Sequence, residues 1–90
     1  MTEIELEPDL SQCVQTRARR EYERVMRQLL EIGEEDPDLA ERLEILKSFL
    51  ETNDFNKLRS EYEPCLVEGK TVRFMLWWES GGAAHRMEVL

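Results

Sequence analysis

The spacing of apolar residues changes once along this chain, and that change limits the folds open to it. From Leu10 to Tyr62 apolar side chains recur every three or four residues, the period of an amphipathic helix. From Thr71 to Leu90 the period is two, as in a β-strand with one buried face. Helical segments followed by strands, rather than alternating with them, predict an α+β fold. We therefore expect helices packed on one face of a small antiparallel sheet.

The longest helical pattern covers residues 10–32. Asp9 or Ser11 can cap its start, and Gly33 stands where a left-handed residue commonly ends a helix. Its apolar stripe is longer than any other helix of this chain can cover, so part of it must meet another element or a second copy of the chain. The stripe consists of Leu10, Val14, Ala18, Tyr22, Val25, Leu29 and Ile32.

Two further helices follow. Asp36 and Pro37 provide a capping residue and a proline at the first helical position, so the second helix is expected to begin there. The short link before it makes the first two helices a long antiparallel hairpin. A short third helix is expected over residues 54–62 and is predicted to end at Pro64.

The C-terminal pattern predicts a β-hairpin. Residues 71–78 are rich in β-branched and aromatic types, and residues 83–90 alternate after a turn at Gly81-Gly82. Residues 66–67 offer a further short strand before this hairpin. Residues 3–7 also alternate and form either an edge strand beside the hairpin or a tail.

Composition sets the class of protein. The 90 residues, 41% of them apolar, suffice for one domain: residues 1–8 as edge strand or tail, 9–63 as the helical part and 65–90 as the hairpin part. Twenty acidic against twelve basic residues give a net charge of −8. The longest apolar run, residues 74–78, is too short for a membrane helix, and the first residues are acidic where a secretory signal is basic. We therefore expect a cytoplasmic protein that does not bind membranes.

The register of the hairpin decides which residues share a face. With Gly81 and Gly82 as a two-residue loop, one face is apolar except for its single histidine, and a register shifted by one residue would lose that face. On this apolar face Trp78 is expected opposite His85, Leu76 opposite Met87 and Phe74 opposite Val89. On the other face Trp77 is expected opposite Arg86, Met75 opposite Glu88 and Arg73 opposite Leu90.

Neighbouring Trp77 and Trp78 must point to opposite sides of their strand. With Trp78 in the core, Trp77 faces outward, surrounded by Met75, Leu90 and the stem of Arg86. Aromatic, methionine and arginine side chains are enriched at protein interfaces. We therefore expect Met75, Trp77, Arg86 and Leu90 to form the contact surface of a non-enzymatic interaction module, a homodimer or an adaptor for another protein. The alternative is a cation–π contact between Arg86 and Trp77 that requires no partner.

A second candidate surface is a stripe of basic side chains on the first helix. A row of guanidinium groups can bind phosphates, so nucleic-acid binding is an alternative function. A solvated face is the other interpretation, in which Arg17 pairs with Glu21 and Glu23 with Arg27, or the stripe docks against the acidic residues 34–44. The net charge of −8 favours this second interpretation, because it repels a polyanion. The stripe consists of Arg17, Arg20, Arg24 and Arg27.

Catalysis and metal binding have little support. His85 is the only histidine, and Cys13 and Cys65 are too far apart in sequence for a zinc or redox motif, so they are interpreted as buried thiols. A nucleophilic site would need Cys65 or Ser80 close to His85. A pocket around Trp78 and His85, serving a small-molecule binder or an enzyme, is therefore only the second alternative, and we expect no cofactor.

Overall fold

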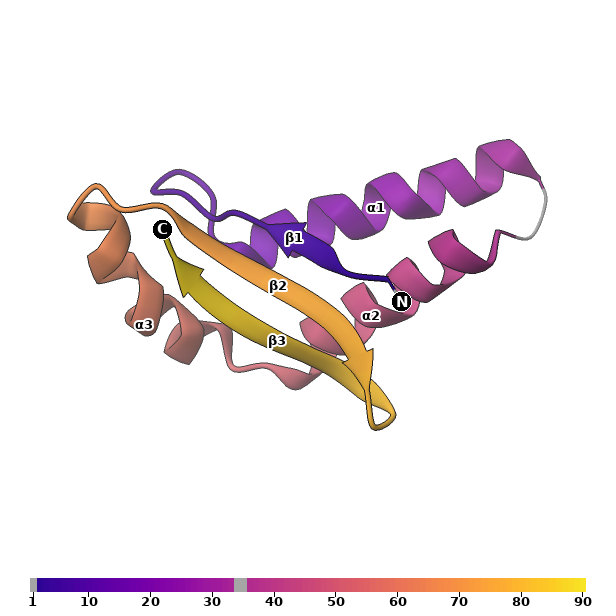
Figure 1. Cartoon of the computed structure of the whole chain (residues 1–90). Helices are drawn as coiled ribbons and strands as arrows, with labels where there is room; N and C mark the ends of the chain where they lie inside the picture. Colours follow the sequence, from indigo (N-terminus) through magenta and orange to yellow (C-terminus); the bar gives the residue numbers. More distant parts are fainter. Residues whose placement is uncertain (1, 34–35) are drawn as a thin grey trace.

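The computed structural model describes residues 2–33 and 36–90, in which three helices lie on one face of a three-stranded antiparallel sheet (Figure 1). The strand order is β1-β2-β3, so the N-terminal strand and the C-terminal strand both flank β2. This is the expected α+β arrangement, including the edge strand near the N-terminus. The elements are β1 (Ile4–Leu6), α1 (Val14–Ile32), α2 (Pro37–Thr52), α3 (Phe55–Val67), β2 (Val72–Glu79) and β3 (Gly82–Val89).

Helix α1 begins at Val14, four residues later than predicted. The reason is Asp9, whose carboxylate accepts hydrogen bonds from the backbone N–H groups of Ser11 (2.8 Å) and Gln12 (2.7 Å). These bonds hold a turn where the helix was expected to start. The first helical N–H, that of Val14, donates instead to the Tyr62 hydroxyl oxygen at 3.0 Å, so a side chain of α3 caps α1.

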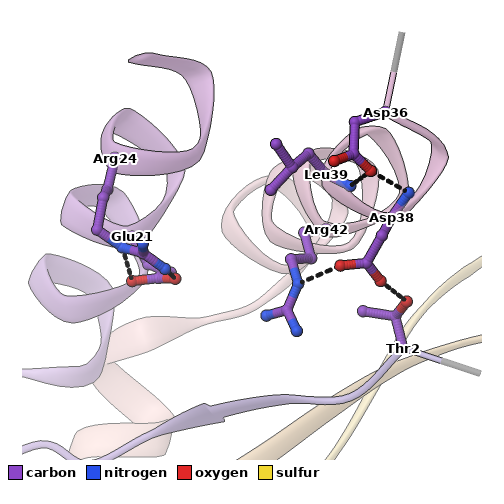
Figure 2. Close-up of polar contacts among 7 residues, drawn as sticks. All are labelled: Thr2, Glu21, Arg24, Asp36, Asp38, Leu39 and Arg42. Carbon is purple, nitrogen blue, oxygen red and sulfur yellow. Dashed lines mark hydrogen bonds and ion pairs between the residues drawn. The ribbon is translucent and has the colours of Figure 1, made fainter. Parts of the chain in front are cut away.

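The other predicted helix ends of the helical hairpin are confirmed. Gly33 adopts φ 67° after α1, and its N–H donates to the Leu29 carbonyl. Asp36 caps α2 by accepting from the backbone N–H groups of Asp38 (3.0 Å) and Leu39 (3.3 Å), as Figure 2 shows. In the same view the Thr2 hydroxyl donates to the Asp38 carboxylate at 2.8 Å, which ties the start of the chain to the start of α2.

Helix α3 continues through Pro64 to Val67, so the predicted end at Pro64 and the extra strand at residues 66–67 are both wrong. A proline inside a helix removes one N–H donor but keeps its carbonyl acceptor. The Pro64 carbonyl accepts from the Glu68 N–H at 3.1 Å, and the last turn is closed in this way. The helical part therefore extends beyond residue 63, and the strands of the hairpin begin at Val72.

The hairpin keeps the predicted faces but not the predicted pairs. The loop is Ser80-Gly81, with φ of 54° and 82°, and Gly82 already belongs to β3. Two consecutive positive φ values are typical of the type I′ turn, one of the two common two-residue hairpin turns. The register is shifted by two residues from the prediction, and a shift of two leaves every side chain on its predicted face. The observed pairs include Trp78 with Ala83, Trp77 with Ala84, Leu76 with His85, Met75 with Arg86, Phe74 with Met87 and Arg73 with Glu88.

The core lies between the helices and the inner face of the sheet. Phe74 of β2 packs edge-on against Tyr62 of α3, with ring centroids 5.6 Å apart. Phe49 of α2 makes similar edge contacts with Phe55 and with His85. All three helices therefore contribute to one cluster over the sheet. Its buried members include Ile4, Leu6, Val14, Ala18, Val25, Ile45, Leu46, Val72 and Leu76.

Candidate interaction surface on the outer face of the sheet

The side chains of β2 alternate strictly between the core and the candidate surface. Its inward side chains, Val72, Phe74 and Leu76, are fully buried, whereas the outward Met75 and Trp77 are half-buried. The helices pack against the inward side, so the outward side chains are covered only by neighbours in the sheet. This places two of the predicted interface residues on the open face.

The Trp77 ring is held by polar groups at both ends. Its indole N–H donates to the Glu79 carboxylate at 2.8 Å. The Arg86 guanidinium lies 6.0 Å from the ring centroid, at the outer limit for a cation–π contact, and also pairs with Glu88 at 3.2 Å. Across the strand pair, Trp77 faces the small Ala84 rather than Arg86. These contacts orient the ring, and the residue of β3 directly opposite it is the small Ala84.

The structure brings together three of the four predicted interface residues. Met75 is paired with Arg86, which places both next to Trp77. Leu90 lies elsewhere: its N–H donates to the Thr71 carbonyl at the opposite end of the hairpin. At about 3.3 Å per residue, that is about 20 Å along the strand from the position opposite Trp77. The prediction that Leu90 borders Trp77 within one subunit is wrong: even the predicted register placed Leu90 opposite Arg73, and the observed register moves it two residues further from Trp77.

Charged side chains of both signs border the outer face. Arg73 of β2 pairs with Glu5 of β1 at 3.0 Å and lies 3.6 Å from Glu7. On the opposite side, Arg86 and Glu88 of β3 make their own pair. The rim is thus a mixture of acids and bases, the arrangement that surrounds the apolar centre of many protein interfaces.

Trp78 and His85 do not form the pocket considered from the sequence. Trp78 is 37% exposed at the end of β2 and faces Ala83, so its predicted place in the core is wrong. His85 packs instead between Phe49 and Phe74, with ring centroids 5.6 and 6.0 Å away. The histidine therefore contributes to the core.

The arginine stripe is partly neutralised within the chain. Arg17 pairs with Asp9 at 2.8 Å, and Arg24 pairs with Glu21, as Figure 2 shows for the second pair. These are not the pairs predicted from the sequence, which did not anticipate that Asp9 lies in a turn beside α1. Hydrogen bonds from the Ser11 hydroxyl and the following backbone, together with Arg17, lower the pKa of Asp9 to about 2.

A groove of about 660 Å³ runs beside this stripe. Arg17, Arg20 and Arg24 line it, but acidic groups line it as well, so it does not present the uniform positive charge that binds a polyanion. Arg27 is not among the lining residues. The acidic members are Glu5, Glu7, Asp9 and Glu21.

A second group of exposed apolar side chains lies on the C-terminal half of α1. Leu30 is 77% exposed, and Met26 and Ile32 are also exposed. Of these three, Ile32 belongs to the predicted stripe, whereas Met26 and Leu30 lie outside it. These side chains form a rival candidate for a contact surface.

The two cysteines are free and half-buried. Burial raises the pKa of the Cys13 thiol, whereas hydrogen bonds with Thr16 lower it, and the pKa is lowered on balance. Within residues 2–33 and 36–90, no three His, Cys, Asp or Glu side chains are grouped as a metal site would require. The described helices also lack the combination of length and apolar character needed to cross a bilayer.

Comparison with known proteins identifies the family. An uncharacterized protein of Archaeoglobus fulgidus is 41% identical over 49 residues, covering 52% of this chain and 58% of the archaeal protein. The match therefore spans little more than half of that relative. No solved structure matches the chain. A family model matches residues 2–75, from β1 into the middle of β2, and the chain belongs to this uncharacterised family.

Proposed function

We propose that this chain is a small non-enzymatic interaction module of the cytoplasm that associates through the outer face of its sheet. One observation carries the proposal: β2 places Trp77 and Met75 on the face that the helices leave open. The two free thiols fit a reducing compartment.

Association would bury apolar surface that the subunit cannot bury alone. Trp77 is already oriented by Glu79 and Arg86, so little side-chain freedom is lost when a partner covers the ring. Tryptophan and arginine are the residue types that most often contribute strongly to binding. This pre-organisation favours a contact surface over an incidental exposed ring.

The partner that fits best is a second copy of this chain. The sheet carries Arg73 and Arg86 together with Glu5 and Glu88, so charges of both signs can meet their complements on an identical subunit related by a two-fold axis. A surface whose charges were all of one sign would repel its own copy and would require a different partner. We therefore test self-association first, and an adaptor role toward another protein is one of the possible results of that test.

The test compares the two adjacent tryptophans. Light scattering coupled to size exclusion should give a dimeric mass for the wild type over a concentration series, and Trp77→Ala should shift it toward the monomer. Trp78→Ala is the matched control, because it removes the same side chain from the opposite face and should remain dimeric. A third variant, Leu30→Ser, tests the rival surface on α1.

Two results would overturn the proposal of self-association. The first is a monomeric wild type at every concentration, and the second is a dimer that Leu30→Ser disrupts while Trp77→Ala does not. A monomeric wild type that nevertheless binds another protein, and loses it in Trp77→Ala, would support the adaptor form of the proposal.

Nucleic-acid binding has weaker support. Two arginines of the stripe already pair with carboxylates, and the adjoining groove carries both signs of charge. If this function were correct, binding to nucleic acid at low salt would be lost on charge reversal of Arg20 and Arg24.

A further inference from the structure

The two edges of the sheet differ in how they are protected against pairing with another strand. Strand β1 has three residues, lies among exposed glutamates and is followed by Pro8, all features that discourage further pairing. Strand β3 has eight residues, contains no proline and pairs with β2 without a bulge. Figure 1 shows β3 as the outermost strand on the side away from β1. An unprotected edge of this length is a template for another strand.

The hairpin register shows which backbone groups of β3 point outward. The two-residue loop makes Glu79 and Gly82 a hydrogen-bonded pair, so the outward positions are every second residue from Ala83. The Ala83 N–H does point outward, since it donates to the Ser48 hydroxyl of α2 at 3.0 Å. Beyond Ala83, no hydrogen bond in the described part of the chain occupies the outward groups of His85, Met87 or Val89.

We propose that β3 pairs antiparallel with β3 of a second copy, with Met87 on the two-fold axis. The inference rests on the proposed self-association and specifies its geometry: the two sheets join edge to edge through β3, so their outer faces become one continuous surface and do not stack on each other. In this register His85 lies opposite Val89 of the partner subunit, and the outward backbone groups of both strands form hydrogen bonds. Arg86 lies opposite Glu88 of the partner subunit, twice by symmetry, so each of these cross-strand pairs joins opposite charges.

The neighbouring registers are less favourable. An axis at Arg86 would place two arginines opposite one another, and an axis at Glu88 would place two glutamates together. An axis at His85 would require the Ala83 backbone, whose N–H the Ser48 hydroxyl already binds. Charge and hydrogen bonding therefore select Met87 as the centre.

The same register explains the place of Leu90. It puts Leu90 of the partner subunit opposite Ala84, the small residue that faces Trp77. Because Ala84 leaves space above the sheet, the partner's Leu90 can reach the Trp77 ring. Leu90 is 57% exposed and Val89 is 45% exposed in the single subunit, and both would be covered in the dimer. The four predicted interface residues then meet, but across two subunits.

Charge reversal tests this register. Arg86→Glu places two glutamates opposite one another across the axis, and Glu88→Arg places two arginines in the same relation. Each variant alone should weaken the dimer at least about tenfold, because two symmetric pairs change from attraction to repulsion. An equimolar mixture of the two variants should restore dimers, since every facing pair in the mixed dimer joins opposite charges. Native mass spectrometry identifies the mixed species by its mass.

Matched controls separate this effect from net charge. Glu23→Arg and Arg19→Glu make the same charge changes at exposed positions of α1 and should leave the dissociation constant unchanged. Val89→Pro removes an outward N–H without removing a bond to β2, and it should also weaken the dimer while the near-ultraviolet spectrum of the tryptophans stays native.

The outcomes distinguish the two proposals. Suppose that the wild type is dimeric and that Trp77→Ala disrupts the dimer. The register is then overturned if Glu88→Arg dimerises normally, or if the mixture of charge-reversal variants stays monomeric. Either result leaves the proposed interaction module standing. A wild type that never dimerises would overturn both the self-association and the register.

Discussion

The hydroxyl of Tyr62 provides a sharp test of how the helices are joined. It accepts the Val14 N–H at 3.0 Å, and both residues are buried, Tyr62 at 2% and Val14 at 1% exposure. Tyr62→Phe removes one oxygen and keeps the ring, whose edge contact with Phe74 is unchanged. The variant therefore isolates the bond between α3 and the start of α1.

The expected cost follows from the buried N–H left without an acceptor. Such a group costs roughly 1–3 kcal/mol, so the free energy of unfolding should fall by about 2 kcal/mol. In a domain of this size each kcal/mol changes Tm by about 4–8 °C, which predicts a fall of about 10 °C. The surrounding packing is preserved, so the urea m-value should not change.

Urea unfolding followed by tryptophan fluorescence measures this quantity. Every variant should be compared at one protein concentration, because dimerisation adds to apparent stability. Tyr22→Phe is the control: Tyr22 is only half-buried, and in the described part of the chain its hydroxyl forms no hydrogen bond. If Tyr62→Phe is as stable as the wild type to within about 0.5 kcal/mol, the capping role assigned to Tyr62 is wrong.

Two further predictions concern the turn and the acid range. Gly81→Ala should destabilise the hairpin by about 1 kcal/mol because φ is 82°, whereas Gly82→Ala should be tolerated, since its added methyl would lie 3.6 Å from the Ser48 hydroxyl. Equal effects in thermal unfolding would contradict the observed loop. The Asp9 carboxyl should titrate near pH 2 by carbon-13 NMR, and its contribution to stability should persist above pH 3.8 and be lost as the pH falls toward 2. An ordinary carboxyl titration would refute the turn at Asp9.

The helices and the faces of the sheet were predictable because they depend on local periodicity. The capping of α2 by Asp36 and the end of α1 at Gly33 each follow from one residue in a suitable place. The separation of Trp77 from the core face follows from the alternation of a strand. Neither inference required knowledge of what packs against the element.

The predictions from sequence that were wrong concern features that depend on distant residues or on backbone strain. The start of α1 depends on the local turn at Asp9 and also on Tyr62 of α3, which is far away in sequence. The loop is Ser80-Gly81 and not the predicted Gly81-Gly82, so Ser80 adopts a positive φ. The pairing of the whole strand determines this position of the loop. Trp78 is exposed because its position lies beyond the core cluster, and periodicity cannot show how far the helices reach. Leu90 was assigned to the Trp77 surface because its side chain shares that face, but the shared face says nothing of its distance along the strand.

The central claim, association through β3, is tested most directly by isotope-filtered NMR on a mixture of labelled and unlabelled protein. Non-hydrogen-bonded antiparallel pairs bring their Cα atoms to about 4.5 Å, close enough for a strong contact between Cα protons. The account predicts an intermolecular contact between the Cα protons of Arg86 and Glu88 of the partner subunit. A dimer whose intermolecular contacts lie on α1, or pair Arg86 with its own copy, would contradict it.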